Sequence, residues 1–264
     1  MKKILKLIVI GLSSLFLVAC SSQPEKKAAV KPATETTEVT FYVTRHGKTI
    51  FNTMGKVQGW SDTPLTAEGI EVAEFLGKGL KDIKFDSVYT SDSGRARETA
   101  KIVMAAQGQT DLEINEEANF REMNFGKFEG ELDEEMWNPA AEKLGFKNRE
   151  ALMPELEEVG LEAITNAMAA NDETGTFERY EAVRARFQKE LKEIGQTSLE
   201  KNQENILVVS HGMAISSLLS DLTEENTDRH LPNASVSKVI YKDGALRVES
   251  IGETSYIEKG ESLP

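Results

Sequence analysis

Two short apolar runs, far apart in the sequence, both lead into a histidine followed by a glycine. Residues 39–43 (VTFYV) precede Thr44-Arg45-His46-Gly47, and residues 206–209 (ILVV) precede Ser210-His211-Gly212. β-Branched and aromatic residues in runs of this length favour buried strands. In open α/β sheets, ligands bind beyond the carboxyl ends of the strands. If these two strands are parallel neighbours, both histidines meet at that edge of the sheet.

The elements between the two runs alternate between strand and helix. Residues 70–80 have helical apolar spacing after Thr66, residues 85–90 predict a strand, and residues 95–104 predict a second helix. This order predicts a parallel sheet. Further expected elements are a short edge strand within 113–120, a long helix over 176–194, a helix over 214–222, and a hairpin of strands 236–241 and 245–251 turning at Asp243-Gly244.

One long segment interrupts this alternation. Residues 131–172 are acidic and helical in pattern, and they are broken by Pro139, Gly145, Pro154 and Gly160. Proline and glycine end or bend helices, so several short helices are expected. The segment is interpreted as an inserted helical lid and not as a second independent core.

The N-terminus is typical of an export signal. Met1-Lys2-Lys3 is followed by a mostly apolar stretch over residues 4–18, which is short for a membrane span. The stretch ends in Leu17-Val18-Ala19-Cys20, which resembles the lipobox of bacterial lipoproteins. The resemblance implies that Cys20 is lipidated and becomes the new N-terminus; the alternative is an ordinary secretion signal with an incidental cysteine.

The expected organisation is therefore a signal peptide over 1–20, a flexible polar tether over 21–38 and a folded domain over 39–264. The tether contains prolines, lysines and threonines without apolar periodicity. We expect a lipid-anchored protein on the outer face of the bacterial cytoplasmic membrane or in the cell envelope.

Cys20 is the only cysteine, so no disulfide is expected. The net charge of −13 argues against a nucleic-acid partner.

Four sequence blocks resemble the histidine phosphatase superfamily, specifically its phosphoglycerate mutase-like branch 1. They occur in the family's order between about residues 40 and 250. The blocks are residues 45–49 (RHGKT) with Asn52, Gln58-Gly59, residues 63–66 (TPLT) and Gly69; residues 91–100 (SDSGRARETA); residues 122–130 (EMNFGKFEG); and residues 209–212 (VSHG). The resemblance implies an α/β three-layer sandwich with a mostly parallel central sheet, and a covalent phosphohistidine mechanism.

The residue types also fit phosphoryl transfer by their own chemistry. A phosphate ester needs a nucleophile, cations over its oxygens and an acid for the leaving group. Neutral imidazole can attack phosphorus near neutral pH, so His46 is the candidate nucleophile. Arg45 and Arg95 would clamp the phosphate with forked donors, and His211 would bond a phosphate oxygen.

The proton donor is assigned by the resemblance alone. It points to Glu122, whereas the residue pattern does not separate Glu122 from Glu116, Glu117 or Glu129. The substrate rim is expected to comprise Thr49, Asn52, Gln58, the Gly59 amide and Gly212, although each also suits turn chemistry.

Several residues near the blocks have competing interpretations. Arg97 lies on another helix face from Arg95 and is expected at the surface. His230 is interpreted as structural or exposed. Trp60 and Trp137 either flank an organic substrate or pack the lid. Relatives open the long helix with Gly-Glu-Ser, whereas this chain has Glu178-Arg179, which leaves the substrate contacts there open.

Other reaction classes lack their motifs. The chain has no Gly-x-x-x-x-Gly-Lys-Ser/Thr loop, no paired cysteines and no Gly-x-Ser-x-Gly elbow. We expect catalysis without metal or cofactor on a small-molecule phosphate ester. Residues 129–135 (EGELDEE) are acidic where a mutase would need cations. An exported phosphomonoester phosphatase is therefore favoured; the alternatives are a phosphoglycerate mutase-type phosphoryl transferase and a non-catalytic lipoprotein that binds phosphate esters.

Overall fold

The computed structural model describes residues 36–228 and 230–263. The predicted signal peptide, Cys20 and most of the predicted tether lie outside the described residues. The elements, in chain order, are β1 (Val39–Arg45), α1 (Ile50–Met54), α2 (Ala67–Gly79), β2 (Ser87–Thr90), α3 (Gly94–Gln107), β3 (Ile114–Glu116), η1 (Ala118–Phe120), η2 (Gly126–Phe128), α4 (Asp133–Lys143), α5 (Arg149–Leu152), η3 (Met153–Glu155), α6 (Leu156–Val159), α7 (Leu161–Ala169), α8 (Tyr180–Glu200), β4 (Asn205–Ser210), α9 (Gly212–Leu219), β5 (Val236–Lys242), β6 (Ala245–Glu253) and α10 (Ser255–Glu261).

Strands β1 and β4 are parallel neighbours at the centre of the sheet. Their register pairs Phe41 with Ile206 and Arg45 with Ser210. Both strands end at the same edge, because paired residues advance together along parallel strands. The predicted pairing of the two strands that lead into His-Gly is confirmed.

The sheet contains six strands in the order β3-β2-β4-β1-β5-β6. The pairs from β3 to β1 are parallel, and β5 and β6 add antiparallel pairs. The predicted edge strand is β3, and the predicted hairpin turns at Asp243 and Gly244, both of which have positive φ. The left-handed conformation suits glycine and is tolerated by aspartate.

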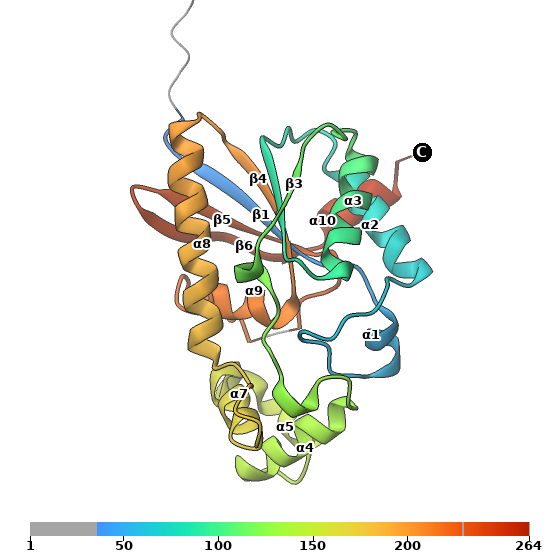
Figure 1. Cartoon of the computed structure of the whole chain (residues 1–264), viewed down its shortest axis with the longest axis vertical. Coiled ribbons are helices and arrows are strands. Elements are labelled where there is room, and N and C mark those ends of the chain that lie inside the picture. The colour runs from blue at the N-terminus through green and yellow to red at the C-terminus, as the bar shows by residue number, and fades with distance from the viewer. Residues whose placement is uncertain (1–35, 229, 264) are drawn as a thin grey trace, which may run out of the picture. The chain divides into compact units, whose positions relative to one another are not determined.

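Helices cover both faces of the sheet, which gives three layers (Figure 1). Along β4, Ile206 and Val208 face the cluster that includes α8 and α9, whereas Leu207 and Val209 face the cluster of α2 and α3. All four side chains are fully buried. A strand buried on both faces has a continuous apolar run, because alternate side chains point to opposite layers. The predicted α/β three-layer sandwich is confirmed.

Helix α8 begins later than the sequence pattern suggests. The expected start was residue 176, whereas the helix spans Tyr180–Glu200. The Asp172 carboxylate accepts hydrogen bonds from the backbone N–H groups of Thr174, Thr176 and Phe177. These bonds hold the preceding residues in a loop, since a side-chain acceptor competes with helical hydrogen bonding.

The insertion forms helices α4 to α7 at one end of the domain (Figure 1). Its buried side chains Met136, Leu152 and Ile164 belong to the same hydrophobic cluster as Phe41 and Phe187. The segment is therefore packed as part of the domain core. Its predicted action as a lid stays a prediction.

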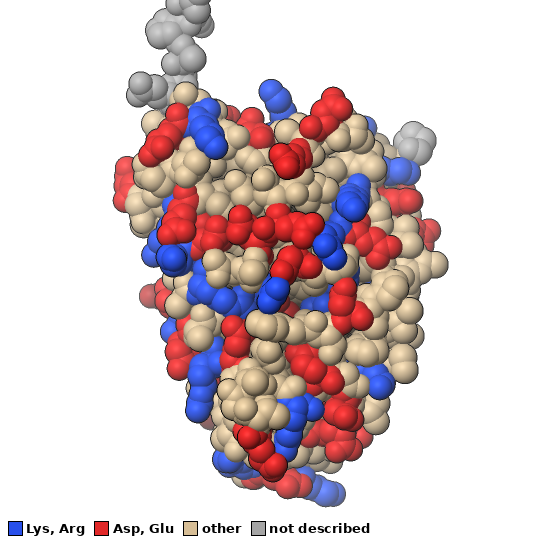
Figure 2. Space-filling model, in the orientation of Figure 1, with Lys and Arg blue, Asp and Glu red and all other residues tan. Residues whose placement is uncertain are grey.

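Charged side chains of both signs are interspersed on the face seen in Figure 2. Acidic side chains adjoin one another in a band across the upper half of that face. Within residues 36–228 and 230–263, no helix combines the length and apolar character needed to cross a membrane.

Helices α2 and α10 approach each other through glycines. A Cβ placed on Gly79 would overlap the backbone carbonyl of Tyr256, and one on Gly260 would overlap the carbonyl of Phe75. We expect Gly79→Ala to lower the free energy of unfolding by about 2 kcal/mol, because overpacking against backbone forces the two helices apart. Urea denaturation measures the change.

Glu74→Ala is the matched control, since Glu74 is exposed on the same helix. Its effect should stay within about 0.5 kcal/mol. An unchanged unfolding midpoint for Gly79→Ala would contradict the close approach of the two helices.

Candidate active site

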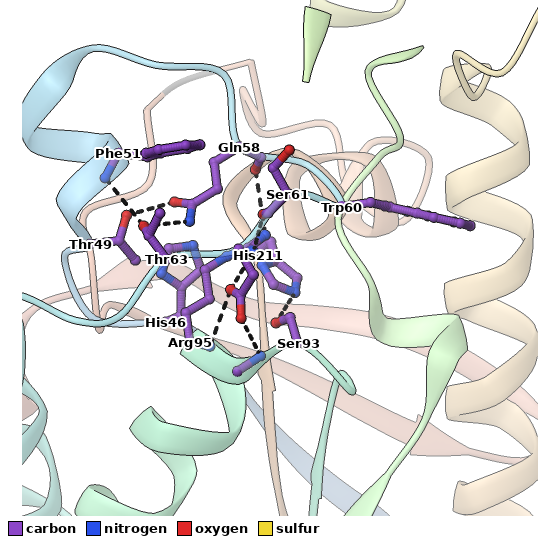
Figure 3. A network of polar contacts seen from close by, with 12 residues as sticks. His46, Thr49, Phe51, Gln58, Trp60, Ser61, Thr63, Ser93, Arg95 and His211 are labelled. Atoms are coloured by element: carbon purple, nitrogen blue, oxygen red, sulfur yellow. Dashed lines mark hydrogen bonds and ion pairs between the residues drawn. The ribbon is translucent and has the colours of Figure 1, made fainter. Parts of the chain in front are cut away.

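The two predicted histidines lie side by side at the carboxyl edge of the sheet (Figure 3). Their ring centroids are 5.2 Å apart. The backbone N–H of His46 donates to the carbonyl of Ser210 at 2.9 Å, which extends the β1–β4 pairing to the residue that carries the imidazole. His46 is 3% exposed and His211 is fully buried.

The hydrogen bonding of His46 fixes its tautomer. Nδ1 lies 2.7 Å from the carbonyl oxygen of Gly47, which can only accept, so Nδ1 carries the proton. Nε2 is left with the free lone pair. Burial, followed by the nearby charges of Arg95 and Arg45, holds the pKa of His46 well below its usual value. The ring is therefore neutral and nucleophilic at neutral pH.

Glycine is required immediately after this histidine. A Cβ on Gly47 would lie 2.6 Å from the carbonyl oxygen of Gly69. The Gly47 N–H donates to the hydroxyl of Thr99 at 3.0 Å. The turn out of β1 can therefore pack directly against the start of α2, and this close packing fixes the position of the His46 ring.

Arg45 lies beside His46 with part of its guanidinium already bonded. One terminal nitrogen donates to the Leu231 carbonyl at 2.6 Å and lies 3.1 Å from Nε2 of His230. Burial lowers the pKa of Arg45 to about 10, so the group stays cationic at neutral pH.

Arg95 is fully buried and is held on three sides. Its guanidinium donates to Asp62 at 3.0 Å and to the carbonyls of Ser61 and Gly59 at 2.9 and 2.7 Å. Asp62 also accepts from the N–H of Gly94 at the start of α3. A cation fixed in this way is pre-organised, since no rotamer freedom remains to be lost on binding.

Three buried nitrogens of this cluster have no hydrogen-bond partner within the described residues: Nε of Arg45, Nε of Arg95 and Nδ1 of His211. His211 Nε2 lies 2.7 Å from the Ser91 hydroxyl, so Nδ1 carries a proton when that hydroxyl donates. Buried donors are rarely left unpaired in proteins. Donors of this kind around a histidine nucleophile suit a bound oxyanion.

Glu122 enters the cluster from the loop between η1 and η2. Its carboxylate accepts from the N–H groups of Met123, Met213 and Ala214 at 2.7–3.0 Å, so it sits against the start of α9. Burial raises the pKa of Glu122, and the three amides offset only part of this effect. The carboxyl group therefore holds its proton to a higher pH than an exposed glutamate.

The loop that carries Glu122 is braced from α8. Arg186 donates to the backbone carbonyls of Asn119 and Glu122 at 2.7 and 3.0 Å and pairs with Glu178 at 3.1 Å. Glu178 also accepts from the N–H of Asn124. The sequence differs from the family pattern at Glu178-Arg179. In the structure, Glu178 helps to hold the loop that carries Glu122, the candidate proton donor.

A second brace holds the backbone around Arg95. The Glu129 carboxylate accepts four backbone hydrogen bonds, from Gly59, Trp60, Ser61 and Phe125. Two of these residues, Gly59 and Ser61, provide the carbonyls that fix Arg95. The sequence block contained Glu129, but no pattern indicated that its carboxylate would bind a distant turn.

A cavity of about 390 Å³ opens in front of His46, Arg45 and Glu122. Of the predicted rim residues, Asn52, Gln58 and Gly212 line it. Sequence reasoning missed Asn233, which donates to the His46 carbonyl at 2.9 Å and also lines the cavity. It lies in a polar loop without a distinctive pattern.

Two predicted rim groups are engaged elsewhere. The Thr49 hydroxyl caps α1 by accepting from Asn52 and bonds Gln58 at 2.6 Å, and the Gly59 amide bonds Glu129. Neither residue lines this cavity, but Gly59 lines a second, smaller cavity together with Glu122 and His211. Their predicted substrate contacts stay predictions.

The residues with competing interpretations line two different cavities. His230 is exposed, as expected, but it lines the main cavity beside Arg45. Trp137 also lines that cavity. Trp60 projects away from the histidines (Figure 3) and lines a smaller cavity of about 270 Å³ together with Arg97 and Arg121. The side chain of Arg97 is 42% exposed and pairs with Glu116, as suits a surface residue.

Within the part of the chain that the structure describes, no group of three or more His, Cys, Asp or Glu side chains could hold a metal ion.

Comparison with known proteins gives one consistent family. The family model of the histidine phosphatase superfamily (branch 1) matches residues 41–254. The probable phosphoglycerate mutase GpmB of Yersinia enterocolitica is 29% identical over 227 residues, which is 82% of this chain and 94% of that protein.

Two solved structures share the fold. The crystal structure of a phosphoglycerate mutase from Bacillus anthracis is 40% identical, with a TM-score of 0.81 over 86% of this chain and 99% of that one. The phosphoserine phosphatase of Entamoeba histolytica, solved with 3-phosphoglyceric acid, is 23% identical, with a TM-score of 0.60 over 83% of this chain and 99% of that chain. The second likeness concerns the fold alone.

The role of Glu129 can be tested by oxyanion binding. In Glu129→Gln, one acceptor oxygen becomes an NH2 donor that faces two backbone donors, so those bonds are lost. We expect the affinity for inorganic phosphate to fall about tenfold, which is about 1.4 kcal/mol, as the carbonyls around Arg95 loosen. Isothermal titration calorimetry measures the affinity.

Glu131→Gln is the control, because Glu131 is exposed two residues away. It should bind phosphate as the unmodified protein does. Unchanged phosphate affinity in Glu129→Gln would show that Arg95 does not depend on this carboxylate.

Proposed function

The chain belongs to branch 1 of the histidine phosphatase superfamily, and from this membership we propose that it is a phosphomonoester phosphatase that works through a covalent phosphohistidine on His46. One observation carries the proposal. Buried His46 is neutral with a free Nε2, and three buried nitrogens of the same cluster, on Arg45, Arg95 and His211, have no partner among the described residues. This is an arrangement for holding and attacking a phosphoryl group.

In the first step, the lone pair of His46 Nε2 attacks phosphorus and the bond from phosphorus to the ester oxygen breaks. Glu122 gives its proton to the departing oxygen, so the alcohol leaves neutral. Arg45, Arg95 and His211 bond the three remaining oxygens, where negative charge is held in the transition state. The Nδ1–H bond to the Gly47 carbonyl supports the positive charge that develops on the ring.

In the second step, water replaces the alcohol. The Glu122 carboxylate takes a proton from the water as its oxygen attacks phosphorus. The nitrogen–phosphorus bond breaks, its electron pair returns to Nε2, and inorganic phosphate leaves. Glu122 is protonated again and the site is restored, as microscopic reversibility requires.

The mutase alternative draws support from the similarity to the probable phosphoglycerate mutase of Yersinia enterocolitica and to the phosphoglycerate mutase of Bacillus anthracis. A mutase must grip the carboxylate of its substrate with cations. Here the stretch 129–135 is acidic, and its Asp133 lines the cavity. Lys48 and Arg149, two cations of the lining, are paired with Glu68 and Asp133. These pairings favour hydrolysis over transfer to a phosphoglycerate.

We further propose that the enzyme acts outside the cytoplasm, tethered through lipidated Cys20. The support is the sequence alone, namely the cationic start, the apolar stretch and Leu17-Val18-Ala19-Cys20. A small-molecule phosphate ester would then reach the enzyme from the envelope or the medium.

The covalent mechanism predicts a chemical intermediate that needs no metal. With excess chelator, the protein should hydrolyse an aryl phosphate, and intact-mass analysis after a non-acidic quench should find a phosphate adduct on His46. His46→Ala should lose at least about 10³-fold of kcat with no adduct, since the nucleophile is gone.

Lys101→Ala serves as the control, because Lys101 is exposed on α3 and lines neither cavity. It should keep its turnover and its adduct. Adduct formation without release to water would favour the mutase alternative, whereas phosphate binding without turnover would favour a non-catalytic binder.

The acid role of Glu122 predicts a leaving-group effect and a pH effect. Glu122→Gln should lower kcat/KM by about 10²–10⁴-fold for an alkyl phosphate, but by less than about tenfold for a nitrophenyl phosphate, whose leaving group needs no proton. Glu122 must be protonated to act, so kcat/KM should fall as pH rises through its raised pKa.

The loss of kcat/KM at low pH should report the protonation of His46. Its pKa is lowered, so activity should persist to a pH below the usual histidine value before His46 is protonated. The alkaline limb should vanish in Glu122→Gln. Equal losses on both esters would remove Glu122 as the acid.

A further inference from the structure

Part of the lining of the cavity in front of His46 is apolar. The insertion contributes Met136, Trp137, Met153, Leu156 and Leu161 to its lining, and we call these five side chains the apolar wall. They come from α4, η3, α6 and the start of α7. The reactive groups of Arg45, His46 and Glu122 line the same cavity. A bound ester would therefore meet charged groups at one part of the cavity and apolar side chains at another.

Burial and stacking hold side chains of the apolar wall in place. Met136 and Leu161 are buried, whereas Met153 is 39% exposed within the same lining. The guanidinium of Arg149 lies over the Trp137 ring at 5.1 Å and pairs with Asp133 at 3.6 Å. This stacking holds the indole against rotation, because the guanidinium covers its ring and is itself fixed by an ion pair.

The cations of the same cavity are already engaged, apart from those at the reacting centre. Lys48 pairs with Glu68 at 2.8 Å, and Arg149 pairs with Asp133. Lys56 donates to the Gly130 carbonyl at 2.9 Å and lies over the Phe51 ring at 5.5 Å. The cavity therefore favours apolar contact over recognition of a second anionic group on the substrate.

We propose that the apolar wall selects phosphate monoesters of apolar, ring-bearing alcohols over those of small polar alcohols. This inference rests on the proposed function for the position of the phosphate at His46. The ring of the alcohol packs against Trp137 and the methionines, whose flexible thioethers adapt to rings of different shape. The volume of about 390 Å³ lies within the range of pockets for small organic ligands.

Matched pairs of ligands test the apolar wall. 2-Phenylethyl phosphate and ethyl phosphate share a primary alcohol leaving group and differ in the ring, and their kcat/KM values are compared. We expect the phenyl ester to be favoured about 10- to 100-fold. Calorimetric affinities of 3-phenylpropylphosphonate and propylphosphonate, which cannot be hydrolysed, should show a preference in the same range.

Variants locate the preference. Trp137→Ala should reduce both ratios to within about threefold of one. Met153→Glu is the second variant, since a partly exposed position tolerates the change and places a charge in the apolar wall; it should lower both ratios at least about fivefold. Leu132→Ala is the control, because Leu132 is apolar and 48% exposed just before α4 but does not line the cavity.

The two measurements separate the two proposals. A phosphonate preference without any ester turnover would overturn the proposed function and leave the apolar wall standing. Turnover with ratios near one would overturn the apolar wall and leave the phosphatase. Failure of either phosphonate to bind, or ratios unchanged in Met153→Glu and Trp137→Ala, would also overturn the apolar wall.

Discussion

The parallel pairing of β1 and β4 is the constraint on which the site depends. Its register places Arg45 opposite Ser210. The residues that follow these two strand ends are His46 and His211, so the two histidines also lie opposite each other. A slip of one residue would reverse the faces of β4 and separate the imidazoles, because side chains alternate along a strand. The apolar side chains that fill both layers fix this register. Packing in the core therefore sets the 5.2 Å separation of the two rings.

Around that pair, partly buried carboxylates hold the chain by accepting backbone N–H groups. Glu129 organises the turn that fixes Arg95, and Asp172 organises the loop before α8. Glu122 uses the same chemistry and yet lies in the cavity. Its burial raises its pKa although three amides favour the charged form. Glu122 therefore differs from Glu129 and Asp172 in its burial beside the cavity and not in the type of group.

The site residues combine opposite electrostatic demands within a small volume. Burial and two guanidinium groups keep His46 neutral, while each guanidinium keeps one Nε donor that has no partner among the described residues. The two buried guanidinium groups are themselves stabilised by hydrogen bonds, Arg45 to the Leu231 carbonyl and Arg95 to Asp62. The apolar wall lines the same cavity as Arg45, His46 and Glu122, so polar and apolar surfaces face one space.

Local patterns determined the secondary-structure elements and several candidate site residues of this protein. Strand runs, the Thr66 cap and the His-Gly turns depend on neighbouring residues, so they predicted a parallel sheet and the meeting of His46 with His211. The three-layer sandwich and the choice of Glu122 came from the resemblance to the family. Contacts between distant segments were decided only by the tertiary structure. Asn233 bonds the His46 carbonyl across 187 residues, Glu129 braces a turn 70 residues earlier, and Thr49 turns inward to cap α1. The sequence alone specifies the side chains that can make these bonds, but the choice of partner follows from packing, because a buried polar group pairs with whatever donor the core brings within reach.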